Sequence, residues 1–277
     1  MGVRVDAVCF CERTPPSQPS PVKGEEAHDK SVTPLRVTDN RERIALDINL
    51  IQKIAIYALP VIFAITLHEA AHGYVAKHFG DPTAYMLGRV TLNPLKHIDP
   101  VGTILVPLGL FLLSKITGGL GFMFGWAKPV PVNFSQLRRP KQDMLWVAAA
   151  GPGMNLLMAV FWALLIRLGA SMEGSYLATP MMLMGAAGII INVSLMVLNL
   201  LPVPPLDGGR ILVSLLPNSW AYQVARIEPY GFMILLFLLA SQMLGKILLP
   251  FILLALNLVA PITGLSSSEL NRLFEII

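Results

Sequence analysis

The stretch that decides the fold is residues 51–75, which read IQKIAIYALPVIFAITLHEAAHGYV. It is mostly apolar, and at about 1.5 Å per residue a helix of this length crosses a bilayer core of about 30 Å. Its C-terminal third nevertheless carries His68, Glu69 and His72 within five positions. Ionisable side chains inside lipid are costly unless they are paired or bind an ion. The stretch therefore predicts a membrane-spanning helix with a chemical role.

The rest of the chain has the composition of an integral membrane protein. Of its 277 residues 54% are hydrophobic and 14% are charged, which is roughly half the charged fraction of an average soluble domain. Fourteen of the charged residues lie in residues 1–43. This distribution excludes a soluble globular enzyme, a disordered regulator and a nucleic-acid-binding protein. We expect the lipid bilayer as a partner and no nucleic acid.

Further apolar runs predict an all-α polytopic membrane protein with about five to six membrane segments. Met144–Leu168 and Met181–Leu201 are full spans. Val101–Gly125 is broken by polar residues and glycines, which predicts a re-entrant or hairpin region near the active site. Tyr230–Ala260 is too long for one upright span, so it predicts either a tilted helix with an interfacial piece or a tight hairpin.

The same patterning divides the chain into three parts. Residues 1–43 are proline-rich and highly charged, which predicts a disordered polar tail, or a translation start placed too far upstream. Residues 44–262 form the membrane-embedded domain. Residues 263–277 form a C-terminal amphipathic segment on the membrane surface, in which Ser266 and Glu269 have the spacing of a capping box.

The pair His68 and His72 has the spacing of a metal site. Residues four apart lie one turn apart on the same helix face, so both imidazoles can reach one ion. Glu69, next to the first histidine, can reach a metal-bound water without binding the metal, as in hydrolytic zinc sites. A histidine in a helix is more often simply hydrogen-bonded, but three ionisable residues inside an apolar span favour the metal site.

Asp207 is the best candidate for a third ligand. It follows the span that ends at Leu201, beyond a loop containing Pro202, Pro204 and Pro205. Irregular backbone at membrane depth is tolerated only where it lines protein or a wet cavity, and a hydrolytic site needs such a cavity. The prolines and the following glycines could also encode a plain turn.

Four segments together resemble the site-2 protease family of intramembrane zinc metalloproteases. They are His68-Glu69-Ala70-Ala71-His72, Gly125-Trp126-Ala127-Lys128-Pro129-Val130-Pro131-Val132-Asn133, Ala150-Gly151-Pro152-Gly153-Met154-Asn155 and Pro205-Leu206-Asp207-Gly208-Gly209. The resemblance covers most of residues 48–210, and residues 44–262 would then be the metalloprotease domain. No stretch is long enough for a PDZ domain or a pair of CBS domains, so a compact member is expected.

The resemblance implies specific roles for the residues that match. His68, His72 and Asp207 would bind one Zn²⁺ per chain, and Glu69 would be the general base. Asn155 and Asn199 match family asparagines near the site and would support it.

The segment from Gly125 to Asn133 alternates proline, valine and small residues, which indicates an extended conformation. An extended edge beside a metal site could pair with an unwound substrate strand. This would give Gly125, Pro129, Val130 and Pro131 a substrate-binding role. A rigid interfacial loop, with no contact to substrate, explains the pattern equally well.

The ligand positions and the charges predict the topology. His68 and Asp207 both belong to the C-terminal ends of spans, so these spans must run in the same direction if their side chains meet. Eight of the basic residues after Arg43 lie in Lys77–Lys141, whereas Gly169–Pro180 has none. The positive-inside rule places Lys77–Lys141 and the active site toward the cytoplasm of a cell (inner or plasma) membrane. The tail, with seven basic residues, would then lie outside, which conflicts with that rule.

These observations predict a zinc endopeptidase that hydrolyses peptide bonds within or near transmembrane helices of membrane-protein substrates. The main alternative is a non-catalytic metal-binding membrane protein or transporter, which would need the ligands but not Glu69. A second alternative is an inactive scaffold, which the intact set of ligands disfavours.

Overall fold

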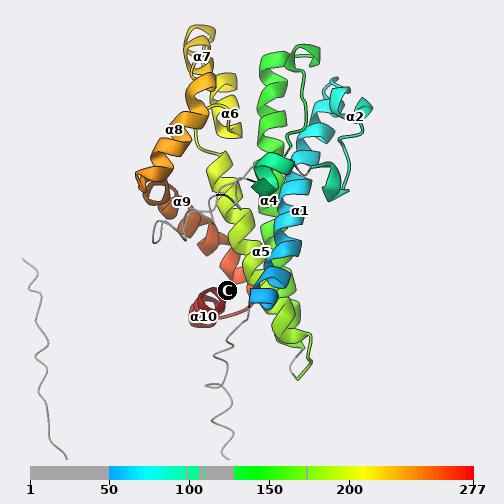
Figure 1. Cartoon of the computed structure of the whole chain (residues 1–277), viewed down its shortest axis with the longest axis vertical. Coiled ribbons are helices and arrows are strands. Elements are labelled where there is room, and N and C mark those ends of the chain that lie inside the picture. The colour runs from blue at the N-terminus through cyan, green and yellow to red at the C-terminus, as the bar shows by residue number, and fades with distance from the viewer. Residues whose placement is uncertain (1–49, 98, 106–108, 110–127, 173) are drawn as a thin grey trace, which may run out of the picture. The chain divides into compact units, whose positions relative to one another are not determined.

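The computed structural model describes residues 50–97, 99–105, 109, 128–172 and 174–277. Within these ranges all regular structure is helical, so the predicted all-α fold is confirmed (Figure 1). The predicted tail, most of Val101–Gly125 and the candidate substrate-binding residue Gly125 lie outside the described residues. The elements are α1 (Leu50–His78), α2 (Thr83–Met86), η1 (Pro94–Lys96), η2 (Pro100–Leu105), η3 (Phe134–Gln136), α4 (Pro140–Ser171), α5 (Ala178–Asn199), α6 (Asp207–Leu215), α7 (Asn218–Ala225), α8 (Glu228–Ala240), α9 (Met243–Val259), η4 (Ala260–Thr263) and α10 (Ser267–Ile276).

Four helical stretches of the described chain are long and apolar enough to cross a membrane. Three of them are α1, α4 and α5, and the fourth is α9 continued by η4. Helices α7 and α8 form a pair bent by 60°, which would add a fifth span if the pair crosses as one. The chain is therefore a multi-pass membrane protein, as its composition predicts.

Local signals set the ends of the two helices that carry most of the site. Helix α1 ends at His78 because Gly80 adopts φ 111°, and the Asp81 N–H then turns back to the Ala76 carbonyl at 2.9 Å. Helix α4 begins with Pro140 in its first turn, where a missing N–H costs nothing. Asp143 in that turn accepts a 2.7 Å hydrogen bond from the Arg139 N–H.

Helices α1, α4 and α5 pack against one another and form the core of the described unit. Glycines on α5 allow the close approach of α4, as small residues do in membrane bundles. A Cβ on Gly188 would lie 2.2 Å from Cγ of Trp162, and one on Gly185 would lie 2.5 Å from Ile166. Both of these α4 side chains are fully buried.

The colour sequence in Figure 1 shows that α1 and α5 run in the same direction and that α4 runs in the opposite one. Helix α4 thus supplies the return crossing that the sequence predicts for Met144–Leu168. It also follows that the end of α1, which carries His68 and His72, lies at the same end of the bundle as the loop before Asp207.

The C-terminal region decides one point that the sequence left open and confirms one prediction. The long run Tyr230–Ala260 is divided between α8 and α9, because Gln242 adopts a left-handed φ of 58° and interrupts the helix. The capping box of Ser266 and Glu269 is confirmed at the start of α10. Leu270 of α10 is buried, and α10 packs against α5, so protein covers its apolar face.

We expect the substitution Gly188→Ala to destabilise the bundle, because the added methyl group has no space beside Trp162. Overpacking of this kind costs about 1–3 kcal/mol. The matched control is Gly245→Ala in α9, where a Cβ would meet no atom within 4 Å. Thermal unfolding in detergent should show a lower midpoint for the first variant only, and equal midpoints would contradict the packing described for α4 and α5.

Candidate metal centre

The two histidines of α1 face one another across a single helical turn. The ring centroids of His68 and His72 are 4.7 Å apart, and their Nε2 atoms are 3.1 Å apart. Both residues are less than a tenth exposed. The spacing predicted from the sequence therefore brings two imidazole nitrogens to one point inside the bundle.

A hydrogen bond to the other ring nitrogen fixes the protonation of each histidine. Nδ1 of His72 lies 2.7 Å from the backbone oxygen of Val147 in α4. A carbonyl can only accept, so in the neutral ring Nδ1 carries the proton and Nε2 presents its lone pair. Nδ1 of His68 lies 2.5 Å from Oδ1 of Asn155, also in α4, which favours the same tautomer.

Asp207 reaches these histidines from the start of α6. Helix α5 ends at Asn199 and the chain continues through an irregular loop, as the prolines predict. The two glycines after Asp207 pack directly on that loop. A Cβ on Gly208 would lie 2.2 Å from the Leu200 carbonyl oxygen, and one on Gly209 would lie 2.3 Å from the nitrogen of Pro204. The close packing of the loop on α6 sets the position of the aspartate.

The three side chains form a nearly equilateral triangle of acceptor atoms. Oδ2 of Asp207 lies 3.2 Å from Nε2 of His68 and 3.3 Å from Nε2 of His72. Tetrahedral zinc with bonds of about 2.0–2.1 Å would separate its ligands by about 3.4 Å. The described part of the chain offers no hydrogen-bond donor to this oxygen, although it is buried. With both histidines in this neutral tautomer, three lone pairs converge on one point, which fits a divalent cation such as zinc.

Gly151 of α4 leaves room for this arrangement. A Cβ at that position would lie 2.4 Å from Nε2 of His72 and 2.6 Å from Nε2 of His68. Any side chain would therefore occupy the space in front of both nitrogens.

Glu69 does not join the triangle but binds the segment that follows the undescribed region. Its Oε2 accepts a 2.8 Å hydrogen bond from the backbone N–H of Val130. Residues 128–133 are not helical, and within them Val130 is buried whereas Pro129 and Pro131 are exposed. This alternation agrees with the extended conformation that the sequence predicts.

Two further hydrogen bonds hold the ends of that segment. The Lys128 N–H donates to the carbonyl of His97 at 2.9 Å, and the Asn133 N–H donates to Oδ2 of Asp81 at 2.6 Å. Asp81 is fully buried and also accepts from Thr83. Sequence reasoning did not identify Asp81, although an aspartate directly after a helix-ending glycine is a signal for such a turn.

The supporting asparagines differ in position. Asn155 contacts His68, as a supporting role requires. Asn199 donates to the carbonyl of Leu195 in its own helix, and its role remains a prediction. The sequence analysis missed Asn192, a fully buried residue of α5 that binds Asn155. Its signal was available, because an asparagine inside an apolar span needs a hydrogen-bonding partner.

The fold and this cluster define a polytopic membrane protein in which two histidines and an aspartate converge at a site that could hold a metal ion. A family model described as "Peptidase family M50" matches residues 175–241, which include Asp207. "Putative zinc metalloprotease YwhC" from Bacillus subtilis is 38% identical over 198 residues, which are 70% of this chain and 84% of that protein. "Putative zinc metalloprotease Rip2" from Mycolicibacterium smegmatis is 31% identical over 185 residues, 67% of this chain and 66% of that protein.

No solved structure matches the chain significantly. The identity and coverage of the Bacillus relative are sufficient to assign the family. The chain belongs to peptidase family M50, the site-2 protease family of membrane-embedded zinc metalloproteases. The predicted family and enzyme class are thereby confirmed.

We expect Gly151→Ala to abolish metal binding while the helix is retained, because alanine favours a helix more than glycine does. Its methyl group would stand 2.4 Å from Nε2 of His72. Gly153→Ala is the matched control, since a Cβ there would meet nothing within 4 Å. Zinc content of the purified proteins should fall from about one per chain to near zero in the first variant only. Full zinc content in Gly151→Ala would rule out this arrangement of ligands.

Proposed function

We propose that the chain is a zinc endopeptidase that cleaves peptide bonds within or near the transmembrane segments of other membrane proteins. His68, His72 and Asp207 would hold the zinc, and Glu69 would act as the general base. The observation that carries the proposal is the convergence of three buried acceptor atoms within 3.3 Å of one another, next to a carboxylate that is not one of them.

Glu69 would move the protons of the reaction. Held by these three residues, zinc would supply a Lewis acid for the scissile carbonyl and would lower the pKa of water to about 7. The Val130 N–H binds Oε2 of Glu69 and holds the carboxylate in one orientation. The other oxygen, Oε1, would then take the proton of the attacking water and pass it to the leaving amine nitrogen.

The extended segment would bind the substrate backbone. Neither Pro129 nor Pro131 has an N–H, and both are exposed, so this part of the segment offers carbonyl acceptors to an incoming strand. Its anchoring by His97 and Asp81 would keep those acceptors fixed while the substrate pairs. Gly125 is assigned the same role from the sequence.

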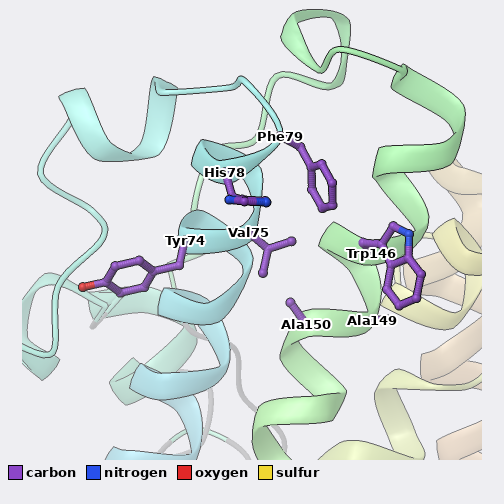
Figure 2. Close-up of a pocket in the computed structure, with 7 residues that line it drawn as sticks. All are labelled: Tyr74, Val75, His78, Phe79, Trp146, Ala149 and Ala150. Atoms are coloured by element: carbon purple, nitrogen blue, oxygen red, sulfur yellow. The ribbon is translucent and has the colours of Figure 1, made fainter.

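A groove between α1 and α4 supports a lipid-embedded substrate. Figure 2 shows Tyr74, Val75 and Phe79 on one side and Trp146 and Ala150 on the other. Nearly all of its lining is apolar, which suits a transmembrane segment better than a soluble peptide.

We also propose that the centre faces the cytoplasm of the cell membrane. The basic residues around the metal-bearing end of the bundle support this orientation through the positive-inside rule. They include Lys77 in the last turn of α1, Lys96 in η1 and Lys141 at the start of α4.

The substitution Glu69→Gln tests the catalytic role. The amide cannot accept the proton of the attacking water, so cleavage of a membrane-protein substrate should fall by about 10²–10⁴-fold. Zinc content should stay at the wild-type level because Glu69 is not a ligand. Both quantities are measured on detergent-purified protein, with His68→Ala as the control that should lose zinc and cleavage together.

The outcomes of that experiment separate the candidate functions. Equal zinc with cleavage only in the wild type supports the endopeptidase. Cleavage that survives Glu69→Gln would remove Glu69 as the base. Zinc in both proteins with no cleavage of a panel of transmembrane substrates would favour a metal-binding protein, and absence of zinc from both would refute the site.

A second prediction concerns the substrate. The carbonyls of a transmembrane helix are hydrogen-bonded within the helix, so the helix must unwind locally before attack. Substrates with proline or glycine near the cut site should therefore be cleaved faster than the same helix with leucine and alanine there. Initial rates in detergent or bilayers measure this, and equal rates for the rigid and the broken helix would contradict it.

A further inference from the structure

A chain of three hydrogen bonds leads from the metal centre to the backbone of α5. Nδ1 of His68 lies 2.5 Å from Oδ1 of Asn155. Nδ2 of Asn155 donates to Oδ1 of Asn192 at 3.0 Å, and Nδ2 of Asn192 donates to the carbonyl of Gly188 at 2.8 Å. Both asparagines are completely buried.

The Gly188 carbonyl, where this series of hydrogen bonds ends, determines which group donates and which accepts in each bond. The Gly188 carbonyl can only accept, so Asn192 must turn its NH₂ group toward it. Oδ1 of Asn192 is then left to accept from Nδ2 of Asn155. This in turn points Oδ1 of Asn155 at His68, where only a proton on Nδ1 can complete the chain.

The two histidines therefore depend on different anchors. His72 donates directly to a backbone carbonyl, that of Val147, which no side-chain substitution removes. His68 donates to an amide side chain, and an amide can rotate by 180° and exchange its donor for its acceptor. A rotated Asn155 would point its NH₂ at Nδ1 of His68. The proton of that histidine would then move to Nε2, where it would block binding of a metal.

We propose that Asn192 is a positioning residue for the metal centre, which fixes the tautomer of His68 through Asn155. This inference rests on the proposed role of His68 as a zinc ligand. Partners of metal-bound histidines typically change metal affinity by 10–100-fold when they are replaced. Asn192 does not bind His68 itself but orients Asn155, the partner of His68.

The test compares Asn192→Leu with Asn192→Asp. Leucine has the same branching and number of side-chain heavy atoms but binds neither Asn155 nor Gly188, so zinc affinity should fall by about 10–100-fold. A buried aspartic acid favours its protonated form, which still accepts from Nδ2 of Asn155 and donates its O–H to the Gly188 carbonyl, so affinity should stay within about threefold of the wild type. Thr263→Val is a control for the general loss of a buried hydrogen bond, because the Thr263 hydroxyl bonds within its own turn. Affinity is measured by competition with a zinc chelator.

A second measurement distinguishes an effect on the tautomer of His68 from a general loss of folding stability. Nitrogen NMR of histidine-labelled, metal-free protein distinguishes a proton on Nδ1 from one on Nε2. The wild type should carry the His68 proton on Nδ1, and Asn192→Leu should shift it toward Nε2. This measurement on the wild type needs no variant to fold, and a proton on Nε2 there would overturn the proposal.

The control His68→Ala distinguishes a failure of the proposed ligand set from a failure of the positioning role of Asn192. If it binds zinc as the wild type does, the proposed ligand set fails. If it loses zinc while Asn192→Leu keeps the wild-type affinity and tautomer, only the positioning role of Asn192 fails. A loss of affinity in Asn192→Leu without a change of tautomer, or an equal loss in Thr263→Val, would also overturn that role.

Discussion

The close approach of three electron-pair donors, two imidazole nitrogens and one carboxylate oxygen, is the constraint on which the rest of the described structure depends. At separations of 3.1–3.3 Å these atoms repel one another unless a cation lies between them. The protein must therefore supply the energy that holds them together. It does so through the packing of α1, α4 and α5 and through hydrogen bonds to the far nitrogen of each histidine.

Glycines at the helix contacts let the helices approach closely enough to bring these three atoms together. Gly151 lets α4 approach the imidazoles, and Gly188 lets α5 approach α4. Gly231 of α8 does the same for the loop before Asp207, since a Cβ there would lie 1.6 Å from the Pro204 carbonyl oxygen. In lipid the hydrophobic effect does not drive helices together, so van der Waals contacts at such close approaches supply much of the free energy of helix association. Glycines thus allow the close helix contacts that bring the three candidate ligands together.

The features that could be predicted from the sequence are those determined by residues close together in the chain. The spacing of His68 and His72 along one helix, the loop that ends in Asp207 and the capping box at Ser266 are set by neighbours in the chain, and each is confirmed in the structure. The bond from Glu69 to Val130 spans 61 positions, and that from His68 to Asn155 spans 87. The sequence could mark Asn192 and Asp81 as residues that need hydrogen-bonding partners, but a single sequence carries no signal that names partners 37 or 52 positions away.

The hydrogen bond between Glu69 and Val130 also joins the residue proposed as general base to the segment proposed to bind substrate. The Val130 N–H faces Glu69 while the neighbouring prolines face outward. A substrate strand that paired with the outer edge of residues 128–133 would pull on the same segment that orients the Glu69 carboxylate. His97 and Asp81 hold both ends of that segment, so it can transmit little displacement. The carboxylate of Glu69 is therefore held in one orientation, as the proposed role of a preorganised general base requires.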